Sequence, residues 1–262
     1  MGLAIVTGAA GGMGRPSAVR FAERGDDVLL CDLNADALDA VAAPLRGGGA
    51  RVDVLAGDVS APDFPARLLE QVGDRPIDAL VHTAGLSPSM SDGPRIFEVN
   101  YHATERLVDA VRPRMAERGC VALISSSSAY MVKSPEIDAA IQALVVRGEA
   151  EQLRAMIGTP QSAYPISKKA VIALVAREAS PFGARGARIA SIAPGFIDTE
   201  MGRAEMCESE QMVAMIAKTP LARLGTGDEI ASVALFLCSP EAAYVSGCDI
   251  KVDGGALAAL GF

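Results

Sequence analysis

The chain has 262 residues, with 24 Lys and Arg against 32 Asp and Glu and a formal net charge of −8. Half of the residues are hydrophobic and 21% are charged, a globular balance that excludes an intrinsically disordered or collagen-like chain. The acidic surplus argues against a nucleic-acid partner, because binding to a phosphate backbone requires a basic surface.

Membrane-spanning, secretory, disulfide and metal-binding patterns are missing from the sequence. The longest uninterrupted apolar run, Ala170–Ala176, has seven residues, whereas a helix needs about 20 to cross a bilayer. The first residues, Met1–Val6, predict a strand and not a signal peptide. The five cysteines include no CxxC pair and there are only two histidines, so we expect neither a disulfide framework nor a metal site. A cytoplasmic protein with no membrane partner is expected.

Seven short apolar runs predict strands. They span Leu3–Thr7, Asp27–Cys31, Arg51–Ala56, Ile77–His82, Cys120–Ser125, Arg188–Ile192 and Cys248–Val252. The runs are apolar almost throughout, which is typical of parallel strands that are covered on both faces.

Longer amphipathic stretches between these runs predict helices. They span Gly14–Arg24, Ala35–Ala43, Pro65–Val72, Tyr101–Arg118, Ser162–Ala179 and Gly227–Leu237. Asn34 and Ser162 are expected as N-caps, and Gly25 and Gly119 are expected where helices end. The alternation predicts an α/β fold: a doubly wound parallel sheet of the Rossmann type, with about seven strands and helices on both faces. No repeat or linker divides residues 1–262, so a single domain is expected.

The first predicted strand is followed by a glycine-rich turn. Thr7–Gly14 has the pattern TGxxxGxG and opens a predicted helix. Glycine allows a tight turn there and lets backbone N–H groups approach a pyrophosphate at the start of the helix. A merely flexible strand-to-helix turn is the alternative, but the position between a first strand and an amphipathic helix favours dinucleotide binding.

Asp32 ends the second predicted strand and bears on the choice of cofactor. A carboxylate at this place can accept hydrogen bonds from an adenosine ribose and would repel a 2′-phosphate. Neither Gly11 nor Leu33 offers a cation for such a phosphate. The sequence therefore favours NAD(H) over NADP(H), although Asp32 could also be only a turn residue.

Tyr164 and Lys168 stand four residues apart near the start of a predicted helix. Residues at this spacing share one face of a helix. A lysine charge lowers the pKa of a nearby phenol, so this tyrosine could exchange a proton with an alcohol or carbonyl oxygen. A tyrosine and a lysine at this spacing more often mark only a solvated helix face. The glycine-rich turn upstream favours the catalytic interpretation here.

In combination these motifs resemble the short-chain dehydrogenase/reductase family over essentially the whole chain. The matching residues are Thr7–Gly14, Asp32, Asp58, Val59, Thr83, Ala84, Gly85, Asn100, Ile124, Ser125, Ser126, Tyr164, Lys168, Pro194, Gly195, Thr199 and Val252–Gly255. The resemblance implies an oxidoreductase that transfers a hydride between NAD and a secondary alcohol or ketone.

The resemblance also implies catalytic roles. Tyr164 is the implied general acid/base, and Lys168 lowers its pKa and binds the nicotinamide ribose. Ser126 holds the substrate oxygen, although its neighbours within Ser125–Ser128 keep that assignment open. Asn100 holds a water that links Lys168 to solvent.

The same resemblance implies a set of cofactor contacts. They are Gly8, Gly12, Met13, Gly14, Asp32, Asp58, Val59, Ala84, Gly85, Tyr164, Lys168, Pro194, Gly195, Ile197 and Thr199. Asp58 and Val59 would contact the adenine, Ala84 and Gly85 the ribose side, and the segment from Pro194 to Thr199 the nicotinamide ring.

The chain departs from the family pattern at three places. His82 replaces the first asparagine of the usual Asn-Asn-Ala-Gly turn, and we expect it to be a hydrogen-bonded structural histidine. The segment from Gly85 to Asn100 is short, and residues 131–161 form an insertion with a helical pattern before the tyrosine. These lengths resemble the bacterial 3α-hydroxysteroid dehydrogenase/carbonyl reductase subgroup, which implies steroid or other apolar carbonyl substrates.

The insertion also bears on assembly, and a further segment on substrate access. A homodimer or homotetramer is expected. If residues 131–161 cover the helices through which many relatives form tetramers, we expect the chain to form only the dimer that uses the C-terminal strand and helix.

Residues 196–220 are expected to form a substrate lid. This segment carries Met201, Met206, Met212 and Met215, whose flexible side chains can pack against apolar ligands. The alternative is that two or more of these methionines face the core.

Two other functions remain open from the sequence. One is a non-catalytic dinucleotide-binding regulator or scaffold, and the other, among enzymes, is a 3-oxoacyl reductase. A regulator has no need of Asn100, Ser126, Tyr164 and Lys168 together, so catalysis on a small-molecule alcohol or ketone is favoured.

Overall fold

The computed structural model describes residues 2–200, 202–203 and 210–262. Its main sheet has seven parallel strands in the order β3-β2-β1-β4-β5-β6-β9. The strands are β1 (Leu3–Thr7), β2 (Asp27–Asp32), β3 (Val52–Ala56), β4 (Ile77–His82), β5 (Met115–Ile124), β6 (Arg188–Pro194) and β9 (Asp249–Val252). A second, small sheet pairs β7 (Ile197–Asp198) with β8 (Gly225–Thr226).

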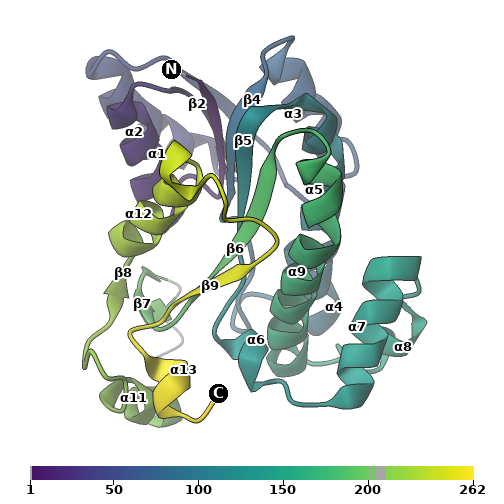
Figure 1. The fold of residues 1–262 in the computed structure, drawn as a ribbon. Coiled ribbons are helices and arrows are strands. Elements are labelled where there is room, and N and C mark those ends of the chain that lie inside the picture. The colour runs from purple at the N-terminus through teal and green to yellow at the C-terminus, as the bar shows by residue number, and fades with distance from the viewer. Residues whose placement is uncertain (1, 201, 204–209) are drawn as a thin grey trace.

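The helices lie on both faces of the main sheet (Figure 1). They are α1 (Gly14–Arg24), α2 (Ala35–Gly47), α3 (Phe64–Val72), α4 (Gly93–Phe97), α5 (Ala103–Val111), α6 (Ser128–Met131), α7 (Pro135–Arg147), α8 (Glu151–Arg154), α9 (Pro160–Gly183), α11 (Glu210–Ala217), α12 (Gly227–Leu237) and α13 (Ala256–Ala259). Figure 1 shows α1, α2 and α12 on one face and α3, α5 and α9 on the other. The predicted single-domain, doubly wound α/β fold is confirmed.

Each face of the sheet packs into its own apolar core. Ile5 and Val6 are both fully buried, yet they belong to different cores because successive side chains of a strand point to opposite faces. Ile5 lies in the core that contains Leu174 of α9, and Val6 lies in the core that contains Phe21 of α1. This burial on both sides explains why the strands are apolar throughout.

The strand order reverses between β1 and β4. From β1 the chain winds outward to β2 and β3, then returns to β4 beside β1 and winds the other way. In open parallel sheets of this kind a crevice forms outside the carboxyl ends of the strands at the reversal.

The element boundaries expected between α5 and β5 are wrong. The helix predicted over Tyr101–Arg118 stops at Val111, and Pro113 lies in the single 3₁₀ turn that follows. Proline has no backbone N–H to donate to a helical hydrogen bond. The chain continues as β5, so Gly119 lies in a strand and not at a helix end.

The N-cap of the long helix α9 also differs from the expectation. Thr159 and not Ser162 is the N-cap, and its hydroxyl accepts the Ser162 N–H with Pro160 at the first helical position. The expected caps at the other two sites are confirmed. Asn34 accepts the Ala37 N–H at 3.1 Å, and Gly25 ends α1 at a φ of 92°.

The insertion forms a separate layer over α9. Its helices α7 and α8 lie outside α9 (Figure 1), and Ile141 and Leu144 of α7 are buried in the same core as Val171 of α9. Within the described residues, no helix is both long and apolar enough to cross a membrane.

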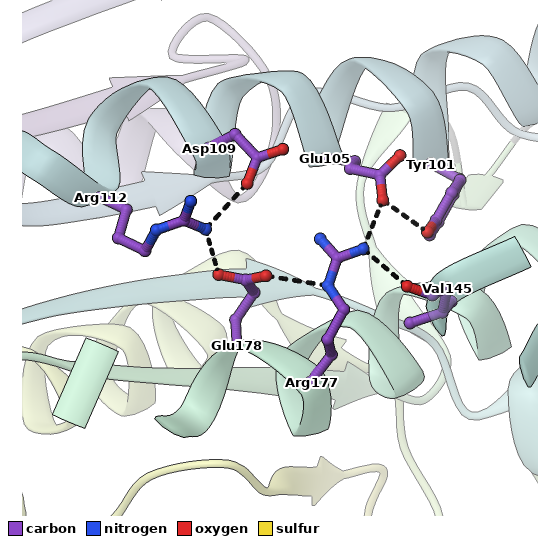
Figure 2. Close-up of polar contacts among 7 residues, drawn as sticks. All are labelled: Tyr101, Glu105, Asp109, Arg112, Val145, Arg177 and Glu178. Carbon is purple, nitrogen blue, oxygen red and sulfur yellow. Dashed lines mark hydrogen bonds and ion pairs between the residues drawn. The ribbon is translucent and has the colours of Figure 1, made fainter. Parts of the chain in front are cut away.

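A polar network ties the insertion to this face of the sheet (Figure 2). Arg177 of α9 donates to Glu105 of α5 at 2.7 Å and to the carbonyl of Val145 in α7 at 2.8 Å. It also pairs with the buried Glu178, which binds Arg112 on its other side. Three helices that are distant in sequence are thus joined by one guanidinium.

Candidate active site

A cleft of about 770 Å³ opens at the carboxyl edge of the sheet. It is lined by the residues that follow β4, β5 and β6 and by the first turns of α9. Nine of the residues expected from the sequence lie along it: Met13, Gly85, Ser126, Tyr164, Lys168, Pro194, Gly195, Ile197 and Thr199. The others end or follow the strands β1 to β4 at the same edge of the sheet, except Asn100, which lies in the helical turn after α4. They are Gly8, Gly12, Gly14, Asp32, Asp58, Val59, Ala84 and Asn100.

The glycine-rich turn connects β1 to α1 tightly. Gly8 has a φ of 65°, which side chains rarely adopt, and a Cβ atom on Gly14 would collide with the carbonyl of Gly8. No side chain caps the start of α1, and no acidic residue lies in its first turn. The positive end of this helix is therefore available to an anionic group, as a pyrophosphate requires.

Asp32 lies at the end of β2 beside this turn. Its carboxylate accepts the N–H of Ala10 in the turn at 3.0 Å and the N–H of Asn34 at 3.3 Å. These two bonds fix the carboxylate next to the glycine-rich turn, where the ribose of a dinucleotide lies in folds of this kind.

Asp58 follows β3 and is held from two sides. It accepts the Ser60 N–H at 2.8 Å and pairs with Arg95 of α4 at 2.7 Å. Burial alone would raise the pKa of Asp58, but the bonds from Ser60 and Arg95 lower it. Val59 beside it is buried.

Lys168 is a buried cation one helical turn beyond Tyr164. Its Nζ donates to the carbonyl of Ile124 at 2.9 Å and lies 5.9 Å from the centre of the Tyr164 ring. Burial lowers the pKa of Lys168 to about 8, so the amine still carries its proton at pH 7. A positive charge at this place favours the phenolate form of a neighbouring tyrosine.

The turn between β5 and α6 gives Ser125 and Ser126 different hydrogen-bond partners. The hydroxyl of Ser125 lies 2.6 Å from Oδ1 of Asp249 in β9 and 2.8 Å from the carbonyl of Ile192 in β6, so its proton is used within the fold. The Oγ of Ser126 instead accepts from the N–H and the hydroxyl of Ser128, at 3.1 and 2.9 Å. Ser126 therefore has its acceptor positions filled and its own proton left to donate.

Asn100 lies in a π-helical turn, Glu98–His102, between α4 and α5. Its side chain accepts the Leu86 N–H at 2.8 Å and donates to the Leu86 carbonyl at 2.9 Å. A Cβ atom on Gly85 would lie 3.0 Å from Asn100 Oδ1 and 3.4 Å from Lys168 Nζ, so both polar atoms lie close to the same side of Gly85.

Comparison with known proteins identifies the family. Residues 2–137 match the family described as short chain dehydrogenase, and residues 150–256 match one described as enoyl-(acyl carrier protein) reductase. The chain belongs to the short-chain dehydrogenase/reductase family. It is therefore an oxidoreductase that acts on alcohol or ketone substrates with a nicotinamide dinucleotide.

Similar proteins in this family differ in substrate. The chain is 32% identical to an L-rhamnose 1-dehydrogenase (NAD(P)(+)) of Sphingomonas sp. strain SKA58, over 96% of this chain and 94% of that protein. It is 30% identical to the 7α-hydroxysteroid dehydrogenase of Escherichia coli K12, over 98% and 94%. A solved short-chain dehydrogenase/reductase, glucose/ribitol dehydrogenase from Brucella melitensis, superposes with a TM-score of 0.79 at 29% identity, over 97% and 96%.

In this short-chain dehydrogenase the segment expected as the lid is described in part. Met201 and Met206 lie outside the described residues, as does the side chain of Met212. Met215 of α11 lines the cleft together with Phe196 and Leu224. At the root of the segment, Thr199 lies against the glycine turn, since a Cβ atom on Gly12 would lie 2.5 Å from its Cγ2.

His82 joins the cofactor side of the site to the helix of Asn100. Its Nδ1 lies 2.7 Å from the hydroxyl of Thr7, and its Nε2 lies 2.9 Å from the hydroxyl of Thr104. Thr104 donates its own proton to the carbonyl of Asn100, so it must accept from His82. The proton of His82 is thereby on Nε2, and Thr7 donates to Nδ1.

This chain of bonds was not predicted in full from the sequence. The sequence indicated a hydrogen-bonded histidine at position 82, but its partner Thr104 comes from α5, which only the packing brings to β4. Burial, and then the charge of Lys168, lower the pKa of His82 to about 3. Among the residues described, no group of His, Cys, Asp and Glu side chains is arranged to hold a metal ion.

Proposed function

We propose that the protein is an NAD(H)-dependent dehydrogenase that interconverts a secondary alcohol and a ketone in a mainly apolar cleft. One observation carries this proposal: Ser126, Tyr164 and the buried Lys168 line a single cleft whose rim includes Met13, beside the uncapped start of α1. A regulator that only bound a dinucleotide would have no use for this arrangement.

The side chains of the cleft divide the proton chemistry among them. Tyr164 takes the proton of the alcohol during oxidation and returns it to the ketone oxygen during reduction, while the Lys168 ammonium stabilises its phenolate. Ser126 donates a hydrogen bond to the same substrate oxygen. Asn100, which lies on the same side of Gly85 as Lys168, holds the water that connects Lys168 to solvent. When bound, the nicotinamide dinucleotide supplies or accepts the hydride.

The residues around the glycine turn fit a dinucleotide in its NAD form. The turn residues Gly8, Gly12, Met13 and Gly14 would hold the pyrophosphate, and Asp32, fixed by Ala10 and Asn34, would bind the adenosine ribose. Within the described chain Asp32 forms no ion pair, and Leu33 beside it is 73% exposed, so a 2′-phosphate would meet a carboxylate and no cation.

The remaining cofactor contacts follow from their places along the same edge. Asp58 and Val59 would contact the adenine, and Ala84 and Gly85 the ribose on the nicotinamide side. The nicotinamide ring would lie against four residues that follow or end β6: Pro194, Gly195, Ile197 and Thr199.

The lining of the cleft supports an apolar substrate such as a steroid. Leu86, Pro88, Met131, Phe196 and Met215 contribute apolar surface, and Lys168 is the only charged side chain among the described lining residues. Polar side chains such as Ser89, Gln161 and Thr199 also line the cleft, so a sugar, the substrate class named for the rhamnose dehydrogenase, is the alternative that the alcohol panel distinguishes. The 7α-hydroxysteroid dehydrogenase is the relative whose named substrate agrees better.

Turnover with a panel of alcohols tests the proposal. We expect NAD⁺ reduction with hydroxysteroids to exceed that with acyl, small cyclic and sugar alcohols, and NAD⁺ to be preferred over NADP⁺. Tyr164→Phe is expected to lower kcat by at least about a hundredfold, because a general acid/base contributes that much, while NADH fluorescence titration shows nearly unchanged affinity. Retained turnover in Tyr164→Phe at saturating substrate would refute the assignment.

A further inference from the structure

The turn between β5 and α6 contains a hydroxyl pair that the family resemblance does not assign. Ser126, the proposed substrate-oxygen donor, and Ser128, the first residue of α6, are linked by two hydrogen bonds. The N–H of Ser128 reaches Ser126 Oγ at 3.1 Å, and the hydroxyl of Ser128 donates to the same atom at 2.9 Å.

These two bonds determine what Ser126 can still do. A serine hydroxyl carries one proton and two acceptor positions. Because Ser128 supplies two donors to one oxygen, the acceptor positions of Ser126 are filled and only its proton remains for a further bond. Ser126 and Ser128 both line the cleft, so the remaining proton of Ser126 is available to the oxygen of a substrate bound there.

We propose that Ser128 is a positioning residue that makes Ser126 an obligate hydrogen-bond donor to the substrate oxygen. The inference rests on the proposed function of Ser126. It explains how one hydroxyl group can serve the reaction in both directions. During reduction, the ketone oxygen needs a hydrogen-bond donor, which Ser126 provides. During oxidation, the alcohol could give its proton to Ser126 instead of Tyr164. Because the acceptor positions of Ser126 are filled, the alcohol proton goes to Tyr164.

The surrounding bonds hold this pair in place. Before the pair, Ser125 is tied to Asp249 of β9 at 2.6 Å, and after it the hydroxyl of Tyr130 donates to the other oxygen of Asp249 at 2.7 Å. The N–H of Ser127 donates to the carbonyl of Pro194 in β6 at 2.9 Å. With both ends anchored to neighbouring strands, the Ser128 hydroxyl remains above Ser126 without help from the substrate.

A double-mutant cycle tests the inference. Kinetics are measured with NAD⁺ and the alcohol of the panel above that gives the fastest turnover. Ser128→Ala keeps the backbone bond and removes only the hydroxyl bond, so kcat/KM is expected to fall roughly three- to tenfold, the worth of one hydrogen bond. Ser126→Ala is expected to lower it by about a hundredfold or more. Adding Ser128→Ala to Ser126→Ala should cause no further fall.

Controls separate positioning from a structural role. Ser128→Thr, which keeps the hydroxyl, should recover the activity, and Ser232→Ala on the exposed face of α12 should behave as the unchanged chain. The thermal midpoint and the NADH affinity of Ser128→Ala should match those of the unchanged chain.

Two different outcomes would overturn the inference. If Ser128→Ala has no effect alone, or lowers kcat/KM by the same factor in both backgrounds, Ser128 does not act through Ser126 and only this inference fails. If Ser126→Ala turns over like the unchanged chain, the role of Ser126 in the proposed function fails as well.

Discussion

His82 is an ionisable side chain that the fold keeps neutral. Its two ring nitrogens are occupied by Thr7 and Thr104, and a second proton would have no acceptor in a fully buried site beside Lys168. The lowered pKa of His82 makes the stability of the fold depend on pH. The pKa is about 3 in the folded chain against 6.5 for an ordinary histidine, so the unfolded chain binds the extra proton first and stability falls as the pH drops below 6.5.

Stability measurements test this property of His82. Between pH 7 and pH 5 the histidine is expected to remove about 2 kcal/mol from the free energy of unfolding, and His82→Asn should abolish that part of the fall in urea titrations. His102→Gln should keep most of it. In ¹⁵N-histidine NMR spectra, the proton of His82 should stay on Nε2 from pH 8 to pH 5; a titration midpoint near 6.5 would contradict the bond chain.

Asp32 is expected to determine the cofactor by a single carboxylate. Asp32→Ala should lower kcat/KM with NAD⁺ roughly tenfold or more, the worth of hydrogen bonds to a charged group, and should raise activity with NADP⁺ because the repulsion is removed. The matched control is Asp39→Asn, which removes one negative charge from an exposed position of α2. A preference for NADP⁺ in the unchanged chain would contradict the proposed use of Asp32.

At the scale of elements, β9 supports the active-site turn from the edge of the sheet. Asp249 accepts the hydroxyls of Ser125 at 2.6 Å, Ser191 at 2.5 Å and Tyr130 at 2.7 Å, and so joins β5, β6 and α6 to the last strand. The hydroxyls of Ser191 and Tyr130 would lose their acceptor if the carboxylate were removed, whereas Ser125 would keep the carbonyl of Ile192 at 2.8 Å.

Asp249→Ala is therefore expected to lower the free energy of unfolding by roughly 2 kcal/mol, because the hydroxyls of the buried Ser191 and the half-buried Tyr130 are left without their acceptor. Asp249→Asn keeps an acceptor oxygen and should recover part of the loss. Urea denaturation measures both, with Asp74→Ala as an exposed control. Equal stability of Asp249→Ala and the control variant would show that the cluster contributes nothing.

Some elements were predictable from the sequence, and the errors have identifiable causes. The strands and α9 follow from apolar runs and spacing that do not depend on distant contacts. The helix expected over Tyr101–Arg118 failed because its apolar pattern continues past Pro113, where the backbone cannot continue as a helix. The π-helical turn that carries Asn100 has no signal in the residue pattern.

At the scale of the molecule, the insertion bears on assembly. Helix α7 covers part of α9 and is fixed there by the bond from Arg177 to the carbonyl of Val145 (Figure 2), while Phe236 of α12 and Tyr244, which precedes β9, are exposed. We expect the face of α5 and α9 to be unavailable to a partner and the chain to pair through β9 and α12. Light scattering should give about twice 27.0 kDa, and a mass of four chains would contradict this expectation.

The sequence by itself determined the sheet, the glycine turn and the pairing of Tyr164 with Lys168, because each depends on residues that are neighbours along the chain or one helical turn apart. Only the tertiary structure decided that Ser128 fills the acceptor positions of Ser126, which tautomer His82 adopts and what the insertion covers. These depend on Ser128, Thr104 and Arg177, whose hydrogen-bond partners are set by the packing of separate elements and not by spacing in the chain.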